Sequence, residues 1–589
     1  AFLDQFRLFL EFAASYYHAP IQTVLQVAIS TAHRRLLLED NNQAASKKTD
    51  REKPLQDRMS LVPLTIEQIP VVEKILNIEK RFFKILIDGV TGSGKSRCYF
   101  EAIAYWRNYG NILYLVPEIH LSHQVMYTLE SYFGEDVCCV HSQISPKKRA
   151  AIARLVQQKD KGVILVGARS ALFMPLSNIS CVIVDEEHDQ SYKQTEGEFR
   201  YHARDLAIFL AHQNQCICIL GSATPTPKFL LEKSDHNMAR VVLTQRATGH
   251  PVPPIEPWLC SPPTIEQPID QRVLKVIRDV LLEDRKVLVY LNQRGYTPRF
   301  WCESCRIFLT CPGCENAYFV HHKDANQLIC HHCGRASSYN ITCRSCASPM
   351  TPLGFGTERL AEFLQEVFPK TPQYLVDTDH VKTPKQAKKV FEAIAQPGAG
   401  IIIGTQMLSK GHDWPYVTLV VLLMSAYALR NQLTPQLAQN ILQTAGRCGR
   451  HLPGRVILPI AQGEECDPKI KMLCDHHYHQ YVTTYIEKNT AFFAKIYFQG
   501  KEISDLMLKI RNYLKASKCL YEWEGPFMDF PAKRGPYWRV YCIIQEQSRA
   551  LRASRIKKMQ DIIEKNRSLK NIFLSIEIDP LLLDDEFRS

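Results

Sequence analysis

One eight-residue loop, Gly89 to Ser96, constrains the fold of this chain more than any other stretch. It reads GVTGSGKS and fits the pattern G-x-x-x-x-G-K-[ST] at every fixed position. Residues Lys84 to Asp88 predict a short buried strand before it, and the apolar spacing after it predicts a helix that stops at Gly110. In this setting, backbone N–H groups and a helix N-terminus hold phosphates. We therefore predict a nucleotide site rather than an accidental glycine-rich turn.

The loop supplies most of the predicted nucleotide ligands. Lys95 would neutralise phosphate charge, and the Ser96 hydroxyl would bind the Mg²⁺ that accompanies ATP. Glycine lets the loop backbone approach the phosphates where a side chain would block it. The predicted set is Gly89, Thr91, Gly92, Ser93, Gly94, Lys95 and Ser96.

A second predicted strand ends in acidic residues. Asp185 and Glu186 directly follow the apolar residues 182–184. Asp185 is expected to hold Mg²⁺, and Glu186 to polarise the water that attacks the γ-phosphate. A solvated turn is the usual alternative for such a strand end, but the phosphate loop on the same sheet favours catalysis.

Other polar residues could join the two halves of the chain. His188, Ser222 and Thr224 are candidates to relay hydrogen bonds from the acidic motif to the second half, although either hydroxyl could instead be a helix N-cap. In the second half, Arg447 and Arg450 stand in the run QTAGRCGR. Delivered from a second lobe, they would stabilise charge on the γ-phosphate, and a basic surface turn is the alternative.

Further strand ends predict contacts with nucleic acid. Thr405 and Gln406 could touch its backbone, as could residues 117–118 and 167–170, and Asp413 could contact nucleotide; each could instead be a simple loop. Aromatic residues interleaved with cations suit base stacking on a single strand, with packing under a surface loop as the alternative. They are Tyr192, Phe199 and Tyr201, among Lys193, Arg200 and Arg204.

Short apolar runs alternate with helical stretches from Lys84 to about Leu243, and again from Lys286 to Ile460. This alternation predicts an α/β fold with two parallel sheets, each covered by helices on both faces. The proline-rich stretch from His250 to Pro268 is expected to be an interdomain linker. After about Asp467 the pattern changes to helices followed by strands.

The net charge and the cysteines indicate which kinds of partner and metal the chain could bind. The 589 residues carry a formal net charge of +12, which is compatible with a polyanionic partner. No apolar run approaches the ~20 residues that span a bilayer, and we expect no secretion signal at the start. Four Cys-x-x-Cys pairs therefore favour metal over disulfides, as two closed structural zinc sites with nested or sequential pairing. The pairs are Cys302 and Cys305, Cys311 and Cys314, Cys330 and Cys333, and Cys343 and Cys346.

Together these motifs resemble those of superfamily 2 helicases, since the phosphate loop, Asp-Glu-Glu-His, Gly-Ser-Ala-Thr-Pro and Gln-x-x-Gly-Arg-x-Gly-Arg occur in this order. Over nearly the whole chain, the details resemble the bacterial primosomal protein N′ (PriA) family. The matching stretches are residues 91–95, 115–119, 185–194, 404–407 and 410–413, the eight-cysteine insertion and residues 578–581.

The resemblance implies an ATP-dependent 3′→5′ DNA helicase that recognises stalled or abandoned replication forks and helps reload the replicative helicase. It implies two RecA-like lobes, a zinc-binding insertion in the second lobe and a C-terminal α+β domain. Gln68 would contact adenine, and residues 191–204 would form an aromatic-rich loop that couples DNA to ATP hydrolysis. The implied zinc pairing is nested: Cys302, Cys305, Cys343 and Cys346 on one ion, and Cys311, Cys314, Cys330 and Cys333 on the other.

The implied cofactors are ATP, Mg²⁺ and two Zn²⁺. The implied partners are forked and single-stranded DNA, primosome proteins, the loader of the replicative helicase and the single-stranded-DNA-binding protein, for a monomer in the bacterial cytoplasm. We place a partial winged-helix region and linker at 1–54, lobe 1 at 55–248, and a linker with the start of lobe 2 at 249–300. The zinc insertion follows at 301–349, the rest of lobe 2 at 350–466 and the C-terminal domain at 467–589.

The chain departs from the family pattern at three places. Nothing resembles the family's N-terminal domain that binds the 3′ end of the leading strand, so we expect the chain to start within the following winged-helix domain. The residues Met424-Ser425-Ala426 replace an acidic turn, and Pro435-Gln436 replaces an acidic–basic pair. These changes could weaken coupling between ATP and DNA. One alternative function is therefore a fork-binding primosome assembly module with weak or no unwinding activity; another superfamily 2 motor is a third, disfavoured by the cysteine pairs.

Overall fold

The structure is a computed structural model of the chain. It describes residues 2–28, 61–79, 81–117, 119–141, 144–231, 236–261, 263–291, 299–302, 304–305, 307–309, 319–320, 327–329, 336–338, 342–343, 345–353, 355–377, 380–381, 384–409, 413–424, 433–460, 467–485, 492–501, 508–510, 524–534, 537–546, 549–565 and 573–578. Among these residues, no helix combines the length and the apolar character that crossing a bilayer requires.

The first lobe is a seven-stranded sheet in the order β3-β4-β2-β5-β7-β1-β8, and every neighbouring pair runs parallel. The strands are β1 (Phe83–Gly89), β2 (Asn111–Leu115), β3 (Val137–Val140), β4 (Ile164–Gly167), β5 (Ile179–Val184), β7 (Ile217–Ser222) and β8 (Met238–Leu243). The sequence predicts strands at 84–88, 111–116, 162–167, 181–184 and 215–220, and five of the seven strands lie there. The edge strands β3 and β8 are not predicted, because β3 has only four residues and Arg240 interrupts the apolar run of β8.

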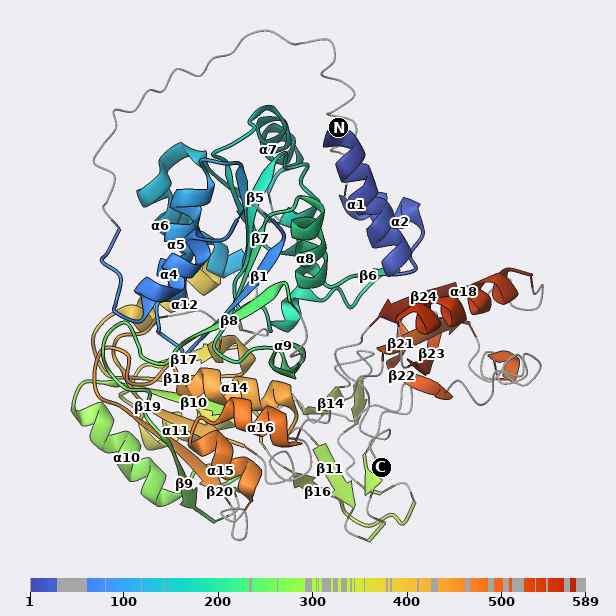
Figure 1. Ribbon diagram of the computed structural model, residues 1–589. Coiled ribbons are helices and arrows are strands. Elements are labelled where there is room, and N and C mark those ends of the chain that lie inside the picture. Colours follow the sequence, from blue (N-terminus) through green and yellow to red (C-terminus); the bar gives the residue numbers. More distant parts are fainter. Residues whose placement is uncertain are drawn as a thin grey trace.

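Helices cover both faces of this sheet (Figure 1). On β1, Ile85 and Ile87 pack in one core with α4 (Gln68–Leu76), α5 (Lys95–Trp106) and α6 (Ile119–Phe133). Leu86 faces the other core, with α7 (Pro146–Gln158), α8 (Ala203–Gln213) and the N-terminal helix α1 (Phe2–Tyr16). The alternation of faces along a strand buried on both sides explains its unbroken apolar run.

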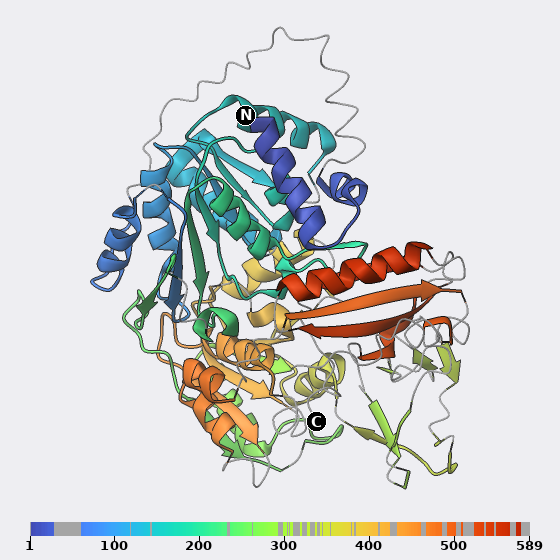
Figure 2. The ribbon, with the colours of Figure 1, turned by 45° about the vertical axis from the view of Figure 1, so that its right-hand side comes forward.

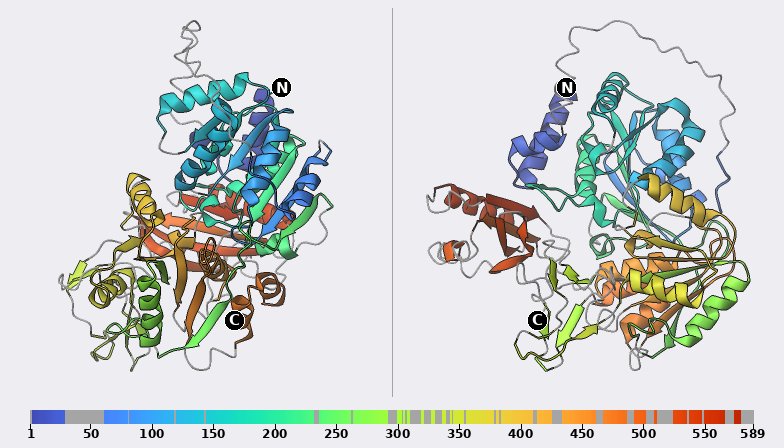
Figure 3. Two further views of the ribbon diagram at one scale, coloured as in Figure 1. Left: turned by 90° about the vertical axis from the view of Figure 1, so that its left-hand side faces the viewer. Right: turned by 180° about the vertical axis from the view of Figure 1, so that it is seen from behind.

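The second lobe is a six-stranded parallel sheet in the order β17-β18-β10-β19-β20-β9. Its strands are β9 (Ile255–Leu259), β10 (Lys286–Leu291), β17 (Gln373–Val376), β18 (Gly400–Gly404), β19 (Val417–Leu423) and β20 (Arg455–Ile460). The helices are α10 (Gln271–Leu282) and α11 (Thr357–Val367) on one face, and α12 (Pro384–Ala395), α14 (Pro435–Ala445), α15 (Pro468–Cys474) and α16 (Tyr478–Tyr485) on the other. Figure 3 shows the two lobes stacked one above the other in both views.

Residues 250–268, predicted as an interdomain linker, also contain a strand. Strand β9 lies within this stretch and pairs with β20 at one edge of the second sheet, with Pro257 opposite Leu458. Proline has no N–H to donate, but an edge strand pairs on one side only and tolerates it. The proline content therefore concealed a strand of lobe 2.

A third unit follows the second lobe. Its mixed five-stranded sheet has the order β22-β23-β21-β24-β6 and is covered by α18 (Arg549–Lys565). The strands β21 (Phe492–Gly500), β22 (Glu524–Arg534), β23 (Tyr537–Glu546) and β24 (Phe573–Ile578) come from the C-terminal region. The last member, β6 (Phe199–Arg200), comes from lobe 1 and pairs parallel with β24. Figure 2 shows this unit with α18 beside the first lobe.

Two helices begin the chain, where residues 1–40 show a helical pattern. Helix α1 and the shorter α2 (Ile21–Ala28) pack against lobe 1, and the Phe12 ring stacks on Phe209 of α8 with centroids 3.4 Å apart. Residues 41–54, whose polar and charged character predicts a linker, lie outside the described residues.

Candidate nucleotide site between the lobes

The phosphate loop connects β1 to α5 with a backbone that only glycine adopts readily. Gly92 and Gly94 have φ of +83° and +78°, in the left-handed region that disfavours side chains. Gln68 Nε2 donates to the Ser93 carbonyl at 2.8 Å, and Arg246 Nε donates to the Thr91 carbonyl at 3.1 Å. Since C=O and N–H point in opposite directions across a trans peptide, the N–H groups of Gly92 and Gly94 point away from these donors.

A cavity of about 340 Å³ lies in front of the loop and is lined from both lobes. Lobe 1 contributes Lys95, Asp185 and Glu186, and lobe 2 contributes Arg447 and Arg450. The structure thus brings together the five residues that the sequence predicts for catalysis. The remaining lining residues are Thr91, Gly92, Gly94, Ser96, Phe100, Val116, Pro117, Val125, Thr128 and Gln443.

Two buried tyrosines hold the Asp185 carboxylate. The Tyr99 hydroxyl donates to Oδ1 at 3.1 Å, and the Tyr114 hydroxyl donates to Oδ2 at 3.4 Å. Burial and the neighbouring Glu186 raise the pKa of Asp185 to about 6. Gly221 on β7 leaves room for this arrangement, because a Cβ there would lie 1.5 Å from the Tyr99 hydroxyl oxygen.

Glu186 has a strained backbone for a residue with a side chain. Its φ is +47°, and backbone in sparsely populated regions collects at functional sites. Its Oε2 is buried and accepts no hydrogen bond from any residue that the structure describes; His188 Nδ1 lies 3.6 Å away. A carboxylate oxygen of this kind is suited to accept a proton from water.

Hydrogen bonds run from the acidic motif into lobe 2, through the residues that the sequence predicts for this relay. His188 Nδ1 lies 2.6 Å from Ser222 Oγ, and His188 Nε2 contacts Gln443 Nε2. Gln443 Nε2 also donates to Thr224 Oγ1 at 3.1 Å, and Gln439 Nε2 donates to the Thr224 carbonyl at 2.9 Å. His188 is therefore bonded to lobe 1 through Ser222 and in contact with lobe 2 through Gln443.

The two arginines follow the end of α14, with Arg447 buried and Arg450 partly buried. Burial and the neighbouring Arg450 lower the pKa of Arg447 to about 9, so the pair is short of compensating negative charge. Arg450 Nε donates to the Gly446 carbonyl at 3.2 Å, and its Nη1 donates to Asp413 at 3.4 Å. Two neighbouring guanidiniums that line a cavity attract an anion.

Gln68, Asp413 and Thr405, which the sequence predicts as ligand contacts, have protein neighbours that the sequence does not predict. The Gln68 amide is 2 % exposed and bonds to the loop itself, with Oε1 accepting from Thr65 N at 3.0 Å. Asp413 contacts Arg450 and His451 and is not among the cavity-lining residues. Their contacts with adenine and nucleotide stay predictions. Thr405 is 2 % exposed, and Glu118 and the stretch 410–412 lie outside the described residues.

The prediction that three aromatic residues stack on bases is wrong for this conformation. Tyr192, Phe199 and Tyr201 are 0–3 % exposed and belong to the core of lobe 1. Phe199 is held there by the pairing of β6 with β24, a contact across 377 residues that local sequence does not reveal. The structure instead agrees with the alternative interpretation, ordinary packing beneath a surface loop.

The cations of the same segment are buried as well, in ion pairs. Arg200 Nη1 lies 3.3 Å from Glu577 Oε2, and Lys193 Nζ donates to the Ile578 carbonyl at 2.6 Å. Arg204 Nη1 lies 3.1 Å from Glu187 Oε2. These groups hold the segment against its neighbours instead of facing solvent.

Sequence reasoning missed Tyr99, Tyr114, Glu187 and Arg246. Glu187 is fully buried and accepts from Thr226 N at 2.7 Å. In the sequence the two tyrosines look like ordinary core residues. Only their hydrogen bonds to Asp185, which join segments far apart in the sequence, give them a role. Arg246 lies three residues after the last strand of lobe 1, and this position was the one available signal.

Four cysteines of the insertion in lobe 2 form a metal-binding arrangement. The sulfurs of Cys302, Cys305, Cys343 and Cys346 all lie within 4.8 Å of one another, and those of Cys302 and Cys346 are 3.5 Å apart. Four thiolates at about 2.3 Å from a tetrahedral zinc lie about 3.8 Å from one another, so the set fits this ion. This is the outer set of the nested pairing. The inner set, Cys311, Cys314, Cys330 and Cys333, lies outside the described residues.

The cluster lies next to short strands of the insertion. The strands β12 (Ile307–Phe308), β11 (Arg299–Cys302) and β16 (Thr351–Leu353) form one small sheet. The strands β13 (Phe319–Val320), β14 (Gln327–Ile329) and β15 (Ala336–Ser338) form another. Cys302 ends β11, so the first ligand is positioned by a sheet.

Comparison with known proteins agrees with these observations. A DEAD/DEAH box helicase family model matches residues 65–232. The replication restart protein PriA of Haemophilus influenzae is 31 % identical over 514 residues, covering 84 % of this chain and 69 % of that protein. The PriA of Bacillus subtilis is 28 % identical, covering 90 % and 68 %. The PriA of Chlamydia pneumoniae is 35 % identical, covering 67 % and 54 %. This chain belongs to the PriA family of replication restart proteins.

Proposed function

We propose that this chain is an ATP-dependent 3′→5′ DNA helicase that recognises stalled or abandoned replication forks and starts primosome assembly by helping reload the replicative helicase. One observation carries the motor part of this proposal. Lys95, Asp185, Glu186, Arg447 and Arg450 line a single cavity between two lobes.

The geometry supports hydrolysis of a nucleoside triphosphate in that cavity. Lys95 Nζ donates to the Gly89 carbonyl at 2.9 Å and could exchange this bond for phosphate oxygens. Ser96 and Asp185 would hold the Mg²⁺ that supplies charge neutralisation, and Glu186 would orient the attacking water. Arg447 and Arg450 would stabilise charge on the γ-phosphate from the second lobe.

Movement of the lobes would convert hydrolysis into translocation. The lobes meet across the cavity and through the His188, Thr224 and Gln443 contacts, so nucleotide loss removes one of the anchors between them. Each cycle of closing and opening would advance the protein along one strand. Binding of forked and single-stranded DNA is supported by family membership and by the net charge of +12.

The zinc region would act in fork loading rather than in hydrolysis. The Cys302 cluster fits one structural Zn²⁺, and family resemblance supports a second ion on the inner cysteines. Primosome proteins, the helicase loader and the single-stranded-DNA-binding protein are the proposed partners, with the chain acting as a monomer in the bacterial cytoplasm.

One substitution tests the motor. Lys95→Ala should abolish DNA-stimulated ATP hydrolysis while DNA binding persists, and the control Lys161→Ala, at an exposed lysine, should behave like the parent protein. Unchanged turnover in the Lys95→Ala protein would overturn the assignment of this site. Unwinding is then measured on forked duplexes with a single-stranded tail of either polarity. ATP-independent fork binding with no unwinding would favour the alternative, an assembly module.

A further inference from the structure

Arg246 contacts both halves of the nucleotide site from behind the phosphate loop. Its guanidinium nitrogens donate to four main-chain carbonyls, and its side chain is almost completely buried. Nε donates to the Thr91 carbonyl of lobe 1 at 3.1 Å. On the lobe 2 side, Nη1 donates to the carbonyls of Cys448 at 2.9 Å and Gly449 at 2.6 Å, and Nη2 donates to the carbonyl of Gly446 at 3.1 Å.

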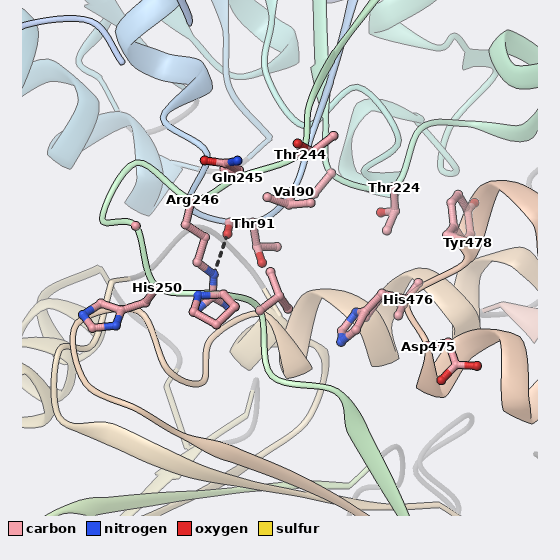
Figure 4. Close-up of a pocket in the computed structure, with 15 residues that line it drawn as sticks. Val90, Thr91, Thr224, Thr244, Gln245, Arg246, His250, Asp475, His476 and Tyr478 are labelled. Atoms are coloured by element: carbon pink, nitrogen blue, oxygen red, sulfur yellow. Dashed lines mark hydrogen bonds between the residues drawn. The ribbon is translucent and has the colours of Figure 1, made fainter. Parts of the chain in front are cut away.

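The residues that Arg246 contacts carry the two halves of the site. Thr91 lies in the phosphate loop, four residues before Lys95. Gly446, Cys448 and Gly449 surround Arg447, whose side chain lines the nucleotide cavity. Figure 4 shows Arg246 extending from the segment after β8 toward Thr91, with the bond drawn as a dashed line.

The backbone of Gly446 lies directly against the Thr91 side chain at this point. A Cβ on Gly446 would lie 1.9 Å from Thr91 Oγ1, so only glycine fits there. The next peptide of the Arg246 segment adds a contact, because Ala247 N donates to the Gly92 carbonyl at 2.9 Å. The phosphate loop is therefore braced from behind by consecutive residues, and one of them also reaches lobe 2.

The chemistry of the contact suits arginine alone. A planar guanidinium presents several donors in a fixed fork, whereas the lysine ammonium is a point charge on a flexible stem. The acceptors on the lobe 2 side follow the C-terminal end of α14, where unpaired helix carbonyls carry partial negative charge. One rigid group thus sets the separation between Thr91 and the Gly446–Gly449 turn.

We propose that Arg246 is a positioning residue that sets Arg447 against the phosphate loop, and that ATP turnover depends on it more strongly than ATP binding does. This inference rests on the proposed function, because it assigns Arg246 a part in the same hydrolytic site. Arg246 lies at the start of the interlobe crossing, the segment that connects lobe 1 to lobe 2. The alignment of the lobe 2 arginines would then depend on this residue. That crossing runs from the end of β8 at Leu243 to the start of β9 at Ile255.

The first experiment separates turnover from binding. DNA-stimulated ATP hydrolysis is measured for Arg246→Ala, Arg246→Lys and the control Arg272→Ala, an exposed arginine at the start of α10. We expect kcat of Arg246→Ala to fall about a hundredfold, as a misplaced catalytic group does, with KM changed by less than about threefold. Arg246→Lys should stay close to Arg246→Ala, and Arg272→Ala should match the parent. Unchanged kcat in Arg246→Ala overturns the inference.

The second experiment excludes a merely structural role. If Arg246 acts through Arg447, adding Arg246→Ala to an Arg447→Ala protein should lower kcat by less than about twofold, because coupled residues are not additive. Free guanidinium, well below denaturing concentrations, should restore part of the turnover in Arg246→Ala but not in the double variant. An equal further loss in the Arg447→Ala background, as general destabilisation would produce, overturns the inference.

The Lys95→Ala protein distinguishes a failure of the proposed nucleotide site from a failure of the role of Arg246. If Lys95→Ala retains turnover, the proposed site fails and the role of Arg246 fails with it. If Lys95→Ala is inactive and Arg246→Ala is fully active, only the inference about Arg246 fails.

Discussion

Tyr99 and Asp185 are joined by a hydrogen bond of 3.1 Å between the tyrosine hydroxyl and Oδ1 of the carboxylate. Tyr99 lies on the helix that follows the phosphate loop, one turn beyond Lys95, and Asp185 lies at the end of β5. The bond therefore ties the proposed metal ligand to the helix that carries Lys95. Groups that orient a metal ligand in this way commonly tune its affinity.

Replacing Tyr99 with phenylalanine tests this relationship. Tyr99→Phe removes one hydroxyl and keeps the ring, so we expect the Mg²⁺ concentration for half-maximal ATP hydrolysis to rise by about tenfold or more. Titration of Mg²⁺ at fixed ATP measures the change. Tyr105→Phe, on the same helix with its hydroxyl bonded to Tyr109, is the matched control and should leave the titration unchanged. Equal titrations for the two variants would remove Tyr99 from the site.

The bond between Gln443 and Thr224 gives a second prediction. Both residues are buried and they join the lobes at 3.1 Å, so Gln443→Ala should lower DNA-stimulated kcat by roughly tenfold to a hundredfold with little change in KM. Thr224→Val removes the acceptor, and the double variant completes a thermodynamic cycle. Fully additive effects would show that the contact does not couple the two residues.

Zinc content provides a third prediction. Metal analysis of the reduced, full chain should find two zinc ions, and Cys302→Ser should remove one of them, because a closed site needs four ligands. Cys474→Ser, at a buried cysteine away from the cluster, is the control. We expect Cys302→Ser to impair loading at forks more than basal ATP hydrolysis. Equal loss of both activities would mean that the cluster mainly holds lobe 2 together.

The fourth prediction concerns pH and His18, in the turn between α1 and α2. Burial and the nearby Arg552 lower the pKa of His18 to about 4, from 6.5 in an unfolded chain. The unfolded state therefore binds more protons between these values, and the free energy of unfolding should fall as pH drops from about 6.5 to 4. Its stabilising contribution is complete above about 6.5.

His18→Asn removes the titrating group and suits the left-handed backbone at this position, where φ is +50°. Thermal unfolding of both proteins across this pH range measures the difference. A variant with the same acid dependence as the parent would assign the effect to another group.

Much of the fold and of the candidate site can be predicted from local sequence patterns. Strand β5 is buried on both faces, so its apolar run and the acids after it stand out. The backbone of the phosphate loop requires glycine at Gly92 and Gly94, so the glycine pattern in the sequence predicts this loop. The spacing of Arg447 and Arg450 predicts a place at the nucleotide site, and both line the same cavity as Lys95.

Contacts between segments that are far apart in the sequence could not be predicted from it. Arg246 has meaning only through the Gly446–Gly449 turn some 200 residues later. Phe199 and Tyr201 looked exposed because cations surround them, but those cations are neutralised by Glu577 and Glu187. Edge strand β9 was hidden because proline is permitted where only one side is paired.

The pairing of β6 with β24 has a consequence for the order in which the protein is made. Chains fold largely from the N-terminus as they leave the ribosome, so lobe 1 and its motifs emerge long before Phe573–Ile578. Until then β6 has a bare edge, and Lys193 and Arg200 have no Glu577 to neutralise them. The segment that follows Asp185 and Glu186 therefore gains its last structural partners only after the C-terminal strands have been made.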